Sequence, residues 1–229
     1  QRDQSFMLGY NSLMRALVAT LAALMLFATT PVVVGDLKDS AAAATRAIEG
    51  DYLAGQLLVA TPKLRDPRFA RTVIFMVDHD DHGAMGLIVN RPLAMASVNE
   101  LLRKLQGGED YKKEGAERGR RVRMNYGGPV GSRRLFFLHS NDYQGEGTKV
   151  VTDNISMTSH KDILLALAKD GGPQRIFLAI GCAAWGPGQL EWEIRRESWV
   201  SVYSGDALVF DDDMASKWQR AFDKRGRNL

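Results

Sequence analysis

The densest group of side chains that could carry chemistry is the run from Asp78 to His82, which reads Asp-His-Asp-Asp-His. Carboxylates and imidazoles bind divalent metal ions, so His79 and His82 are the candidate metal ligands. Adjacent residues of one turn rarely converge on a single ion, and this run separates two apolar segments as a hairpin turn does. We therefore predict a solvated turn here, with a metal site as the alternative.

A glycine-rich stretch at residues 181–188 follows an apolar segment and precedes an expected helix. Such a layout can direct the amides of a helix start at a phosphate group. The stretch lacks the Lys-Ser/Thr ending of a P-loop, it does not match Gly-x-Gly-x-x-Gly, and Pro187 has no amide proton. We predict a tight structural turn in which Trp185 packs, and phosphate or small-molecule binding is the alternative.

The single cysteine, Cys182, lies on the same stretch. A cysteine nucleophile needs a base nearby, and His139, at the end of another expected strand, is the candidate with a suitable position. No Gly-x-Ser-x-Gly surrounds Ser140, and Glu191 and Glu193 are two residues apart on a helix, so they do not face each other. We predict that Cys182 is a buried apolar residue, and we assign no catalytic set and no cofactor.

The elements that must position these residues can be read from apolar periodicity and turn residues. Strands are predicted at residues 55–61, 71–77, 84–90, 122–125, 135–139, 149–155, 175–180 and 199–204. Helices are predicted at residues 97–106, where Ser97 and Glu100 form a capping box, at 159–167 from Ser159, at 189–197, and after Asp213. Pro92 is predicted to close the first hairpin. Early hairpins and a later strand-helix-strand unit indicate an α+β fold.

Composition and charge restrict the class of protein. The chain has 229 residues, 45% of them hydrophobic and 25% charged, which excludes a disordered or multi-span membrane protein. Lys and Arg number 30 and Asp and Glu 27, a net charge of +3. The arginines between positions 118 and 134 follow a loop that also carries Glu109, Asp110, Glu114 and Glu117, and such mixed charge is typical of a solvated loop. No helix-turn-helix is legible. These observations argue against a nucleic-acid partner.

The amino-terminal segment bears on the cellular location. The 19 residues from Ala16 to Val34 carry no charge and follow Met14-Arg15. A basic start, an apolar stretch and small residues before a cut are typical of a signal peptide, but this length also suits a membrane anchor. We predict a signal peptide or membrane anchor at residues 1–35 and a linker or short helix at 36–52. The predicted location is the cell envelope, periplasmic or membrane-anchored, and cytoplasmic if the segment is no true signal.

Several motifs, in order along the chain, resemble the YqgE/AlgH family. They are Gly55-Gln-Leu-Leu-Val-Ala60, Asp66-Pro-Arg-Phe69, Arg71-Thr-Val73, His79, the run from Gly83 to Pro92, Gly127-Gly-Pro-Val130 and Trp185-Gly-Pro-Gly-Gln-Leu-Glu-Trp-Glu193. The last looks like the most distinctive stretch of that family. The resemblance covers residues 53–221, so residues 53–229 are predicted to form a domain of this type.

The resemblance implies an α+β fold in which a bent, mostly antiparallel sheet closes into a pseudo-barrel with flanking helices. It implies no reaction, and the family is often labelled a transcriptional regulator. Two features depart from the pattern. The family usually has Tyr at the position of Cys182, which excludes a shared cysteine mechanism, and its members are normally cytoplasmic and lack a signal-like start.

These observations favour a non-enzymatic binding, accessory or regulatory domain in the envelope, such as a subunit of a membrane-associated assembly with a protein partner. Its predicted binding surface comprises Gly86, Asn90, Arg91, Gly128, His139, Gly181, Trp185, Gly188 and Glu191. A partly exposed tryptophan would mark a partner surface, whereas buried tryptophans would be core anchors. The alternatives are a phosphate- or small-molecule-binding protein or enzyme that uses residues 181–188, and a cytoplasmic transcriptional regulator.

Overall fold

The computed structural model describes residues 52–105, 119–203 and 206–225. The chain divides into two units, residues 1–52 and 53–229, and the fold described here is that of the second unit. The predicted signal or anchor at 1–35 and the predicted linker at 36–52 lie outside the described residues, Tyr52 excepted. Within the described ranges, no helix is both long enough and apolar enough to cross a membrane.

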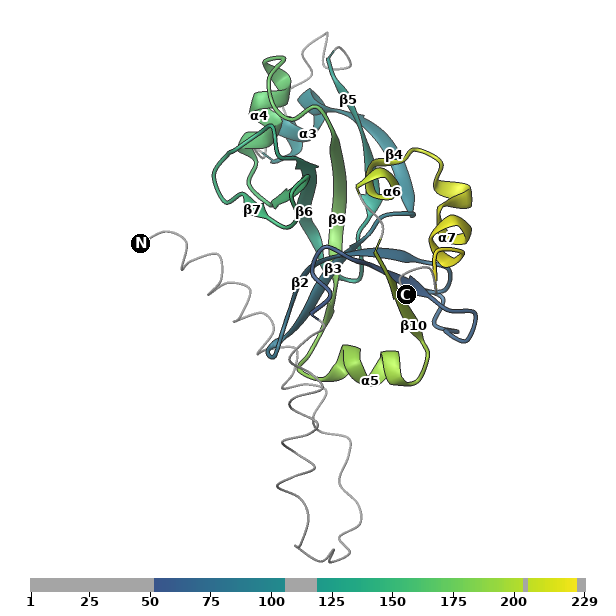
Figure 1. Ribbon diagram of the computed structural model, residues 1–229. Coiled ribbons are helices and arrows are strands. Elements are labelled where there is room, and N and C mark those ends of the chain that lie inside the picture. The colour runs from purple at the N-terminus through teal and green to yellow at the C-terminus, as the bar shows by residue number, and fades with distance from the viewer. Residues whose placement is uncertain (1–51, 106–118, 204–205, 226–229) are drawn as a thin grey trace, which may run out of the picture. The chain divides into compact units, whose positions relative to one another are not determined.

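A ten-stranded sheet forms the body of the domain (Figure 1). Its strands are β1 Leu57–Ala60, β2 Val73–Asp80, β3 Gly83–Ile88, β4 Pro92–Ser97, β5 Arg121–Tyr126, β6 Val130–Ser140, β7 Lys149–Val150, β8 Ile155–Thr158, β9 Ile176–Trp185 and β10 Trp199–Val202. The order is β10-β1-β2-β3-β9-β6-β8-β7, and the pair β4–β5 joins β9 through β5. Only the β5–β9 pairing is parallel among the described strands. The predicted α+β fold with a curled, mostly antiparallel sheet is therefore confirmed.

Five described helices flank this half-barrel, and four of them, all but α6, lie close to where the sequence predicts helices. They are α3 Val98–Leu105, α4 Asp162–Ala168, α5 Gln189–Arg195, α6 Ala207–Phe210 and α7 Met214–Phe222. The cap of α3 is confirmed, because the Ser97 hydroxyl accepts from the amide of Glu100 at 3.0 Å. The cap of α7 is confirmed too, because the Asp213 carboxylate accepts from the amide of Ser216 at 3.2 Å. The Ser159 cap is wrong, since Lys161 precedes α4 and makes no side-chain cap.

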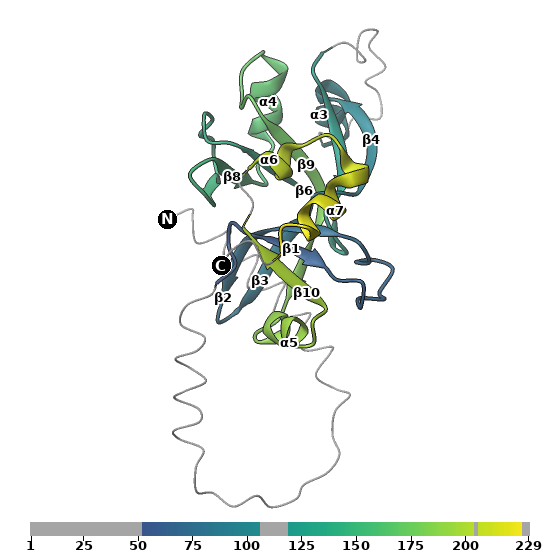
Figure 2. The ribbon, with the colours of Figure 1, turned by 45° about the vertical axis from the view of Figure 1, so that its right-hand side comes forward.

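Two clusters of buried apolar side chains hold helices at opposite ends of the sheet (Figure 2). One joins β1, β2, β3, β9 and β10 to α5 and contains Trp185 and Trp199. The other joins β5, β6 and β9 to α3 and α4 and contains Phe137 and Leu164. The candidate site residues around α5 are thus supported by a core separate from that beneath α3 and α4.

Four boundaries differ from the sequence prediction. Strand β2 continues through Asp80, because buried Val77 and His79 alternate with outward Asp78 and Asp80, so the polar run is mostly strand. Pro92 begins edge strand β4 instead of ending the sheet, a position that proline tolerates. The segment 149–155 divides into β7 and β8 around a turn. Strand β9 extends to Trp185, so the predicted turn at 181–188 is confined to residues 186–188.

Candidate functional site

His79 is a buried link between three parts of the domain. Its Nδ1 accepts from the amide of Leu53 at 3.0 Å, so its proton is assigned to Nε2. The Nε2–H group points at Oε1 of Glu191 on α5, 2.7 Å away. Both ring nitrogens are thus engaged with the protein, and His79 does not belong to a metal cluster with His82. Strand alternation turns the His79 side chain inward, away from the hairpin tip where His82 lies.

Glu193 collects hydrogen bonds from three side chains. Its Oε2 accepts from the indole nitrogens of Trp185 at 3.1 Å and Trp199 at 2.7 Å. Its Oε1 accepts from the Gln189 side chain at 2.9 Å. The two indoles pack edge to face, with ring centroids 6.0 Å apart. Glu191 and Glu193 therefore fasten α5 to β2, β9 and β10 in two directions, consistent with the prediction that they do not face each other.

The outer face of α5 carries Trp192, one of the exposed residues of the stretch from Trp185 to Glu193 that resembles the family. Trp192 is 51% exposed, and the Arg196 guanidinium lies 4.5 Å from the centre of its ring. Arg195, one turn from Trp192, is also exposed. We call these three residues the α5 outer face. Sequence reasoning left Trp192 open between core and surface, and only its place on the helix relative to buried Leu190 distinguishes them.

Three of the four glycines of the predicted binding surface lie where two segments of backbone pack closely together. A Cβ atom on Gly128 would overlap the backbone of Cys182, and one on Gly181 would overlap the carbonyl oxygen of Gly128. Gly86 is similarly enclosed by Ile74 and Phe75 of β2. These three glycines let β9 pass close to its neighbours and cannot form an exposed binding surface. Gly188 differs, because a Cβ there would meet nothing within 4 Å.

Asn90 and Arg91 tie the end of β3 to the segment before β2. The Asn90 side chain accepts from the amide of Val73 and donates to the carbonyl of Arg71, both at 2.9 Å. Arg91 donates to the carbonyl of Ala70 at 2.6 Å. Arg71 has a positive φ of 56°, an unfavourable conformation for a residue other than glycine. Both predicted surface residues therefore stabilise a strained local backbone.

Cys182 and His139 do not form a nucleophile and base. In the β6–β9 register Cys182 faces Val130 and His139 faces Ile176, so six residues, roughly 20 Å, separate their positions. Burial raises the pKa of the Cys182 thiol to about 11. The Cys182 side chain is buried, as predicted.

His139 is fully buried against the edge of Tyr143, with ring centroids 5.5 Å apart. Its Nδ1–H donates to the carbonyl of Ser140 at 2.9 Å, and burial lowers its pKa. Its Nε2 has no hydrogen-bond partner among the described residues. Because the side chain is enclosed, His139 is not part of an exposed binding surface.

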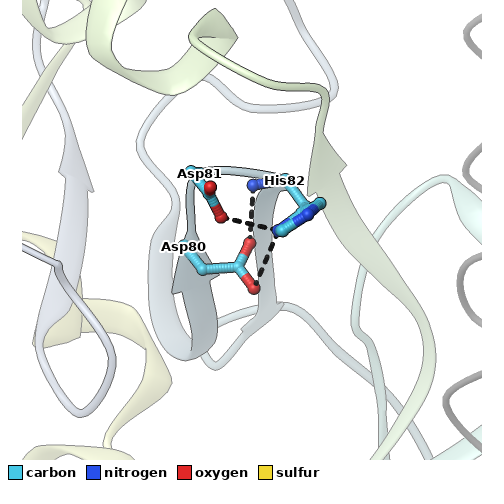
Figure 3. Close-up of side chains that lie close together, drawn as sticks. All are labelled: Asp80, Asp81 and His82. Carbon is cyan, nitrogen blue, oxygen red and sulfur yellow. Dashed lines mark hydrogen bonds and ion pairs between the residues drawn. The ribbon is translucent and has the colours of Figure 1, made fainter.

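Asp80, Asp81 and His82 converge at the tip of the β2–β3 hairpin (Figure 3). His82 Nδ1 lies 2.6 Å from Asp81 Oδ1 and 3.7 Å from Asp80 Oδ2, and the His82 amide donates to Asp80. The donor atoms of the three side chains lie within 4.8 Å of one another, contrary to the expectation for adjacent turn residues. All three are exposed, so the cluster could take a cation only with open coordination to water.

Comparison with known proteins places the chain among relatives of similar length. The family described as DUF179: AlgH-like matches residues 57–229. UPF0301 proteins of Afipia carboxidovorans and Rhodopseudomonas palustris are 44% and 42% identical over 184 and 180 residues, which cover 78% of this chain and 86% and 83% of theirs. The solution structure of the AlgH protein from Pseudomonas aeruginosa matches with a TM-score of 0.66 at 30% identity, covering 77% of this chain and 90% of that one. A crystal structure of a Corynebacterium diphtheriae protein, at 18% identity and a TM-score of 0.55, shares the fold.

Proposed function

We propose a function on the premise that this chain belongs to the AlgH-like family, as the match over residues 57–229 shows. The proposed function is that of a non-enzymatic binding domain that docks a protein partner on the α5 outer face. The observation that carries the proposal is Trp192, which is 51% exposed on a helix whose neighbouring polar side chains are fastened to the sheet. A rigid aromatic side chain that the fold does not require is a typical centre of a protein interface.

The geometry of the α5 outer face suits docking. Arg196 stacks on the Trp192 ring and holds it in one orientation, which reduces the ordering cost of binding. Tryptophan and arginine are the residue types most often found to dominate interface energies. Glu191 and Glu193 hold α5 on the sheet from beneath, so the surface is presented by a fixed element.

The candidate catalytic groups support a binding role over an enzymatic one. Burial keeps Cys182 in its protonated, unreactive form and its only positional partner is far along the strand. The carboxylates of the distinctive stretch are both occupied by side chains of the fold. Phosphate binding at residues 181–188 would need a glycine-rich turn directly before α5. Most of these residues instead belong to strand β9, which speaks against that alternative.

Replacing Trp192 tests the proposed surface. The full-length protein, Trp192→Ala and Leu93→Ala are immobilised separately, and proteins retained from extracts of the source cells are quantified by mass spectrometry. Leu93 is a matched control because it is a large apolar side chain exposed on β4. A specific partner should bind Trp192→Ala about 30-fold more weakly, the effect of losing a hot spot of about 2 kcal/mol, and bind Leu93→Ala normally. Equal retention by all three proteins would contradict the proposed surface.

We also propose an envelope location, supported by the uncharged segment from Ala16 to Val34. The intact mass of the native protein in soluble and membrane fractions tests it. A soluble species that begins near Asp36 or Thr45 would support export and cleavage. A membrane-bound species that keeps the segment would support an anchored subunit. A full-length soluble species would contradict both and favour a cytoplasmic regulator.

A further inference from the structure

His139 is a fully buried histidine near the end of β6. In the sheet it lies opposite Ser156 of β8 on one side and Ile176 of β9 on the other. Strand alternation places its side chain on the same face as Phe137, which belongs to the apolar cluster that joins the sheet to α3 and α4. A titratable ring thus lies in an apolar layer of the core.

The two nitrogens of this ring have different surroundings. Nδ1 lies 2.9 Å from the carbonyl oxygen of Ser140, which can only accept, so Nδ1 carries the proton. Nε2 is buried and has no hydrogen-bond partner among the described residues. In the neutral ring Nε2 is an unpaired acceptor, whereas in the protonated ring it is an unpaired N–H on a buried charge. The second state costs much more, so the closed fold favours the neutral ring.

The strands on either side of His139 place no carboxylate against its ring. Its neighbour on β8 is Ser156, whose hydroxyl donates to Asn141 Oδ1 at 2.6 Å. Its neighbour on β9 is the apolar Ile176. Arg175, just before β9, is exposed and carries the same charge that a protonated ring would carry. Neither strand therefore stabilises a protonated His139.

The loop that follows β6 covers the ring. Tyr143 packs against it edge to face, with ring centroids 5.5 Å apart and an angle of 79° between the planes. Asp142 holds the start of the loop, because its carboxylate accepts from the Ser140 hydroxyl at 2.6 Å and from the amide of Gln174 at 3.1 Å. The loop is therefore fixed at its start, and Tyr143 separates the ring from water.

Two carboxylates belong to the elements packed around the ring. Burial lowers the pKa of His139 below its usual 6.5, and the Ser140 carbonyl and the charge of Asp142 oppose this effect only in part. Asp162, at the start of α4, acts on Tyr143, whose pKa is raised by burial and then by that charge. The closed structure thus lacks a counter-ion strong enough to hold a proton on His139.

We propose that His139 is an acid-sensitive switch that releases the loop from Asn141 to Thr148. At neutral pH the uncharged ring packs beneath Tyr143 and the loop is closed. Once the ring takes up a proton, its Nε2–H finds an acceptor only in water, which requires Tyr143 to leave the ring. Strand β7 follows the loop directly, so opening also loosens the ion pair of Lys149 with Asp78 of β2.

Acid favours the open loop for a reason of linkage. A ring in contact with water has the ordinary pKa of about 6.5, and the closed ring has a lower one, so the open state binds more protons as the pH falls. Between pH 7.5 and 5.0 the opening constant rises at most about 30-fold, the limit for a closed ring that takes up no proton. At pH 7.5 and above both states are neutral, and the switch has no effect.

Amide hydrogen exchange of the full-length chain at pH 7.5 and 5.0 tests the proposal. Mass spectrometry of peptides, corrected for the pH dependence of the intrinsic exchange rate, gives the protection of residues 141–148. We expect this protection to fall about 5- to 30-fold at the lower pH. Protection that is equal at the two pH values would overturn the proposal.

Two histidine variants assign the effect. His139→Asn keeps a donor near the position of Nδ1 and cannot titrate, so its loop protection should differ less than about twofold between the two pH values. His160→Gln is the matched control, because the His160 ring lies 3.8 Å from Glu146 of the same loop, and we expect it to keep the acid-dependent loss. A loss in His139→Asn as large as in wild type, or no loss in His160→Gln, would overturn the assignment.

The wild-type protein provides a second test that does not depend on the folding of a variant. In NMR spectra the His139 ring should titrate at a lower pH than histidines of the urea-unfolded chain, and the amide signals of Tyr143 and Gly145 should change over the same interval. Titration at the unfolded value, or loop signals that stay constant, would overturn the switch. It shares no residue with the α5 outer face, so Trp192→Ala should respond to acid as wild type does.

Discussion

Trp199 on β10 donates its indole N–H to the carboxylate of Glu193 on α5 at a distance of 2.7 Å. The same oxygen accepts from Trp185 on β9 at 3.1 Å. One carboxylate thus satisfies two buried donors from strands that are not neighbours in the sheet. Buried indole N–H groups need an acceptor. The stretch from Trp185 to Glu193 therefore serves in large part to hold α5 against the sheet.

Glu193→Ala should destabilise the domain by about 2–4 kcal/mol, because two buried indole donors lose a charged acceptor. Unfolding in urea, followed by tryptophan fluorescence, measures the change. Glu197→Ala is the matched control on the same segment, since among the described residues its side chain pairs with exposed Lys63 alone, and we expect no measurable change there. Equal stabilities of the two variants would show that the Glu193 hydrogen bonds contribute nothing net.

Sequence patterns predict the fold class and most elements because apolar periodicity and caps are local. They fail where polar residues lie in strands. The run around His79 is predicted as a turn because all five of its side chains are polar or charged, yet His79 itself points inward to Glu191. That pairing joins residues 112 apart in the chain, and no local pattern encodes it.

Two glycine substitutions should differ sharply in effect. Gly128→Ala places a Cβ onto the backbone of Cys182, which cannot move without displacing β9, so we expect it not to accumulate as folded protein. Gly188→Ala meets nothing within 4 Å and bears only the strain of a φ near 70°, about 1–2 kcal/mol. Circular dichroism and urea unfolding of both variants provide the comparison. A folded Gly128→Ala as stable as Gly188→Ala would refute the close approach of the two backbones.

The predicted binding surface illustrates why motif residues are ambiguous in a sequence. In a sequence, a glycine that makes room for a ligand cannot be told from a glycine that makes room for a neighbouring strand. Gly86, Gly128 and Gly181 make room for neighbouring strands. Asn90 could likewise contact a partner or its own backbone, and it does the latter. Of that surface Gly188 stays exposed, and Trp192, which the prediction did not include, is exposed on the helix that follows it. The orientation of Trp192 depends on which face of α5 the core covers.

Cys182 should be inert in the native protein. Burial raises the pKa of its thiol to about 11, so at pH 8 almost none is thiolate, whereas a free cysteine has a pKa of about 8.5. We expect reaction with a disulfide reagent at pH 8 to be at least about 100-fold slower than for free cysteine, and to become normal in concentrated urea. Rapid labelling of the folded protein would contradict this burial and reopen a role for the thiol.

Lys217 should make the stability of the domain depend on alkaline pH. Lys217 is a fully buried residue of α7, and its Nζ donates to the carbonyls of Val89 at 3.0 Å and Val209 at 3.3 Å. Burial lowers its pKa to about 8, and the nearby Asp211 only partly opposes that effect. Lysine in the unfolded chain has a pKa of about 10.4, so between pH 8 and 10 the unfolded state binds more protons than the folded state.

Stability must therefore rise with pH in that interval relative to a variant without the amine. Lys217→Met removes the titration and leaves a constant loss of two hydrogen bonds. We expect wild type to gain up to about 3 kcal/mol over Lys217→Met between pH 7.5 and 10.5, measured by urea unfolding at several pH values. Below pH 7.5 both states carry the charge, so the two stability curves should run parallel. Parallel curves across the whole range would mean that Lys217 keeps the pKa of an exposed lysine and that α7 does not enclose it.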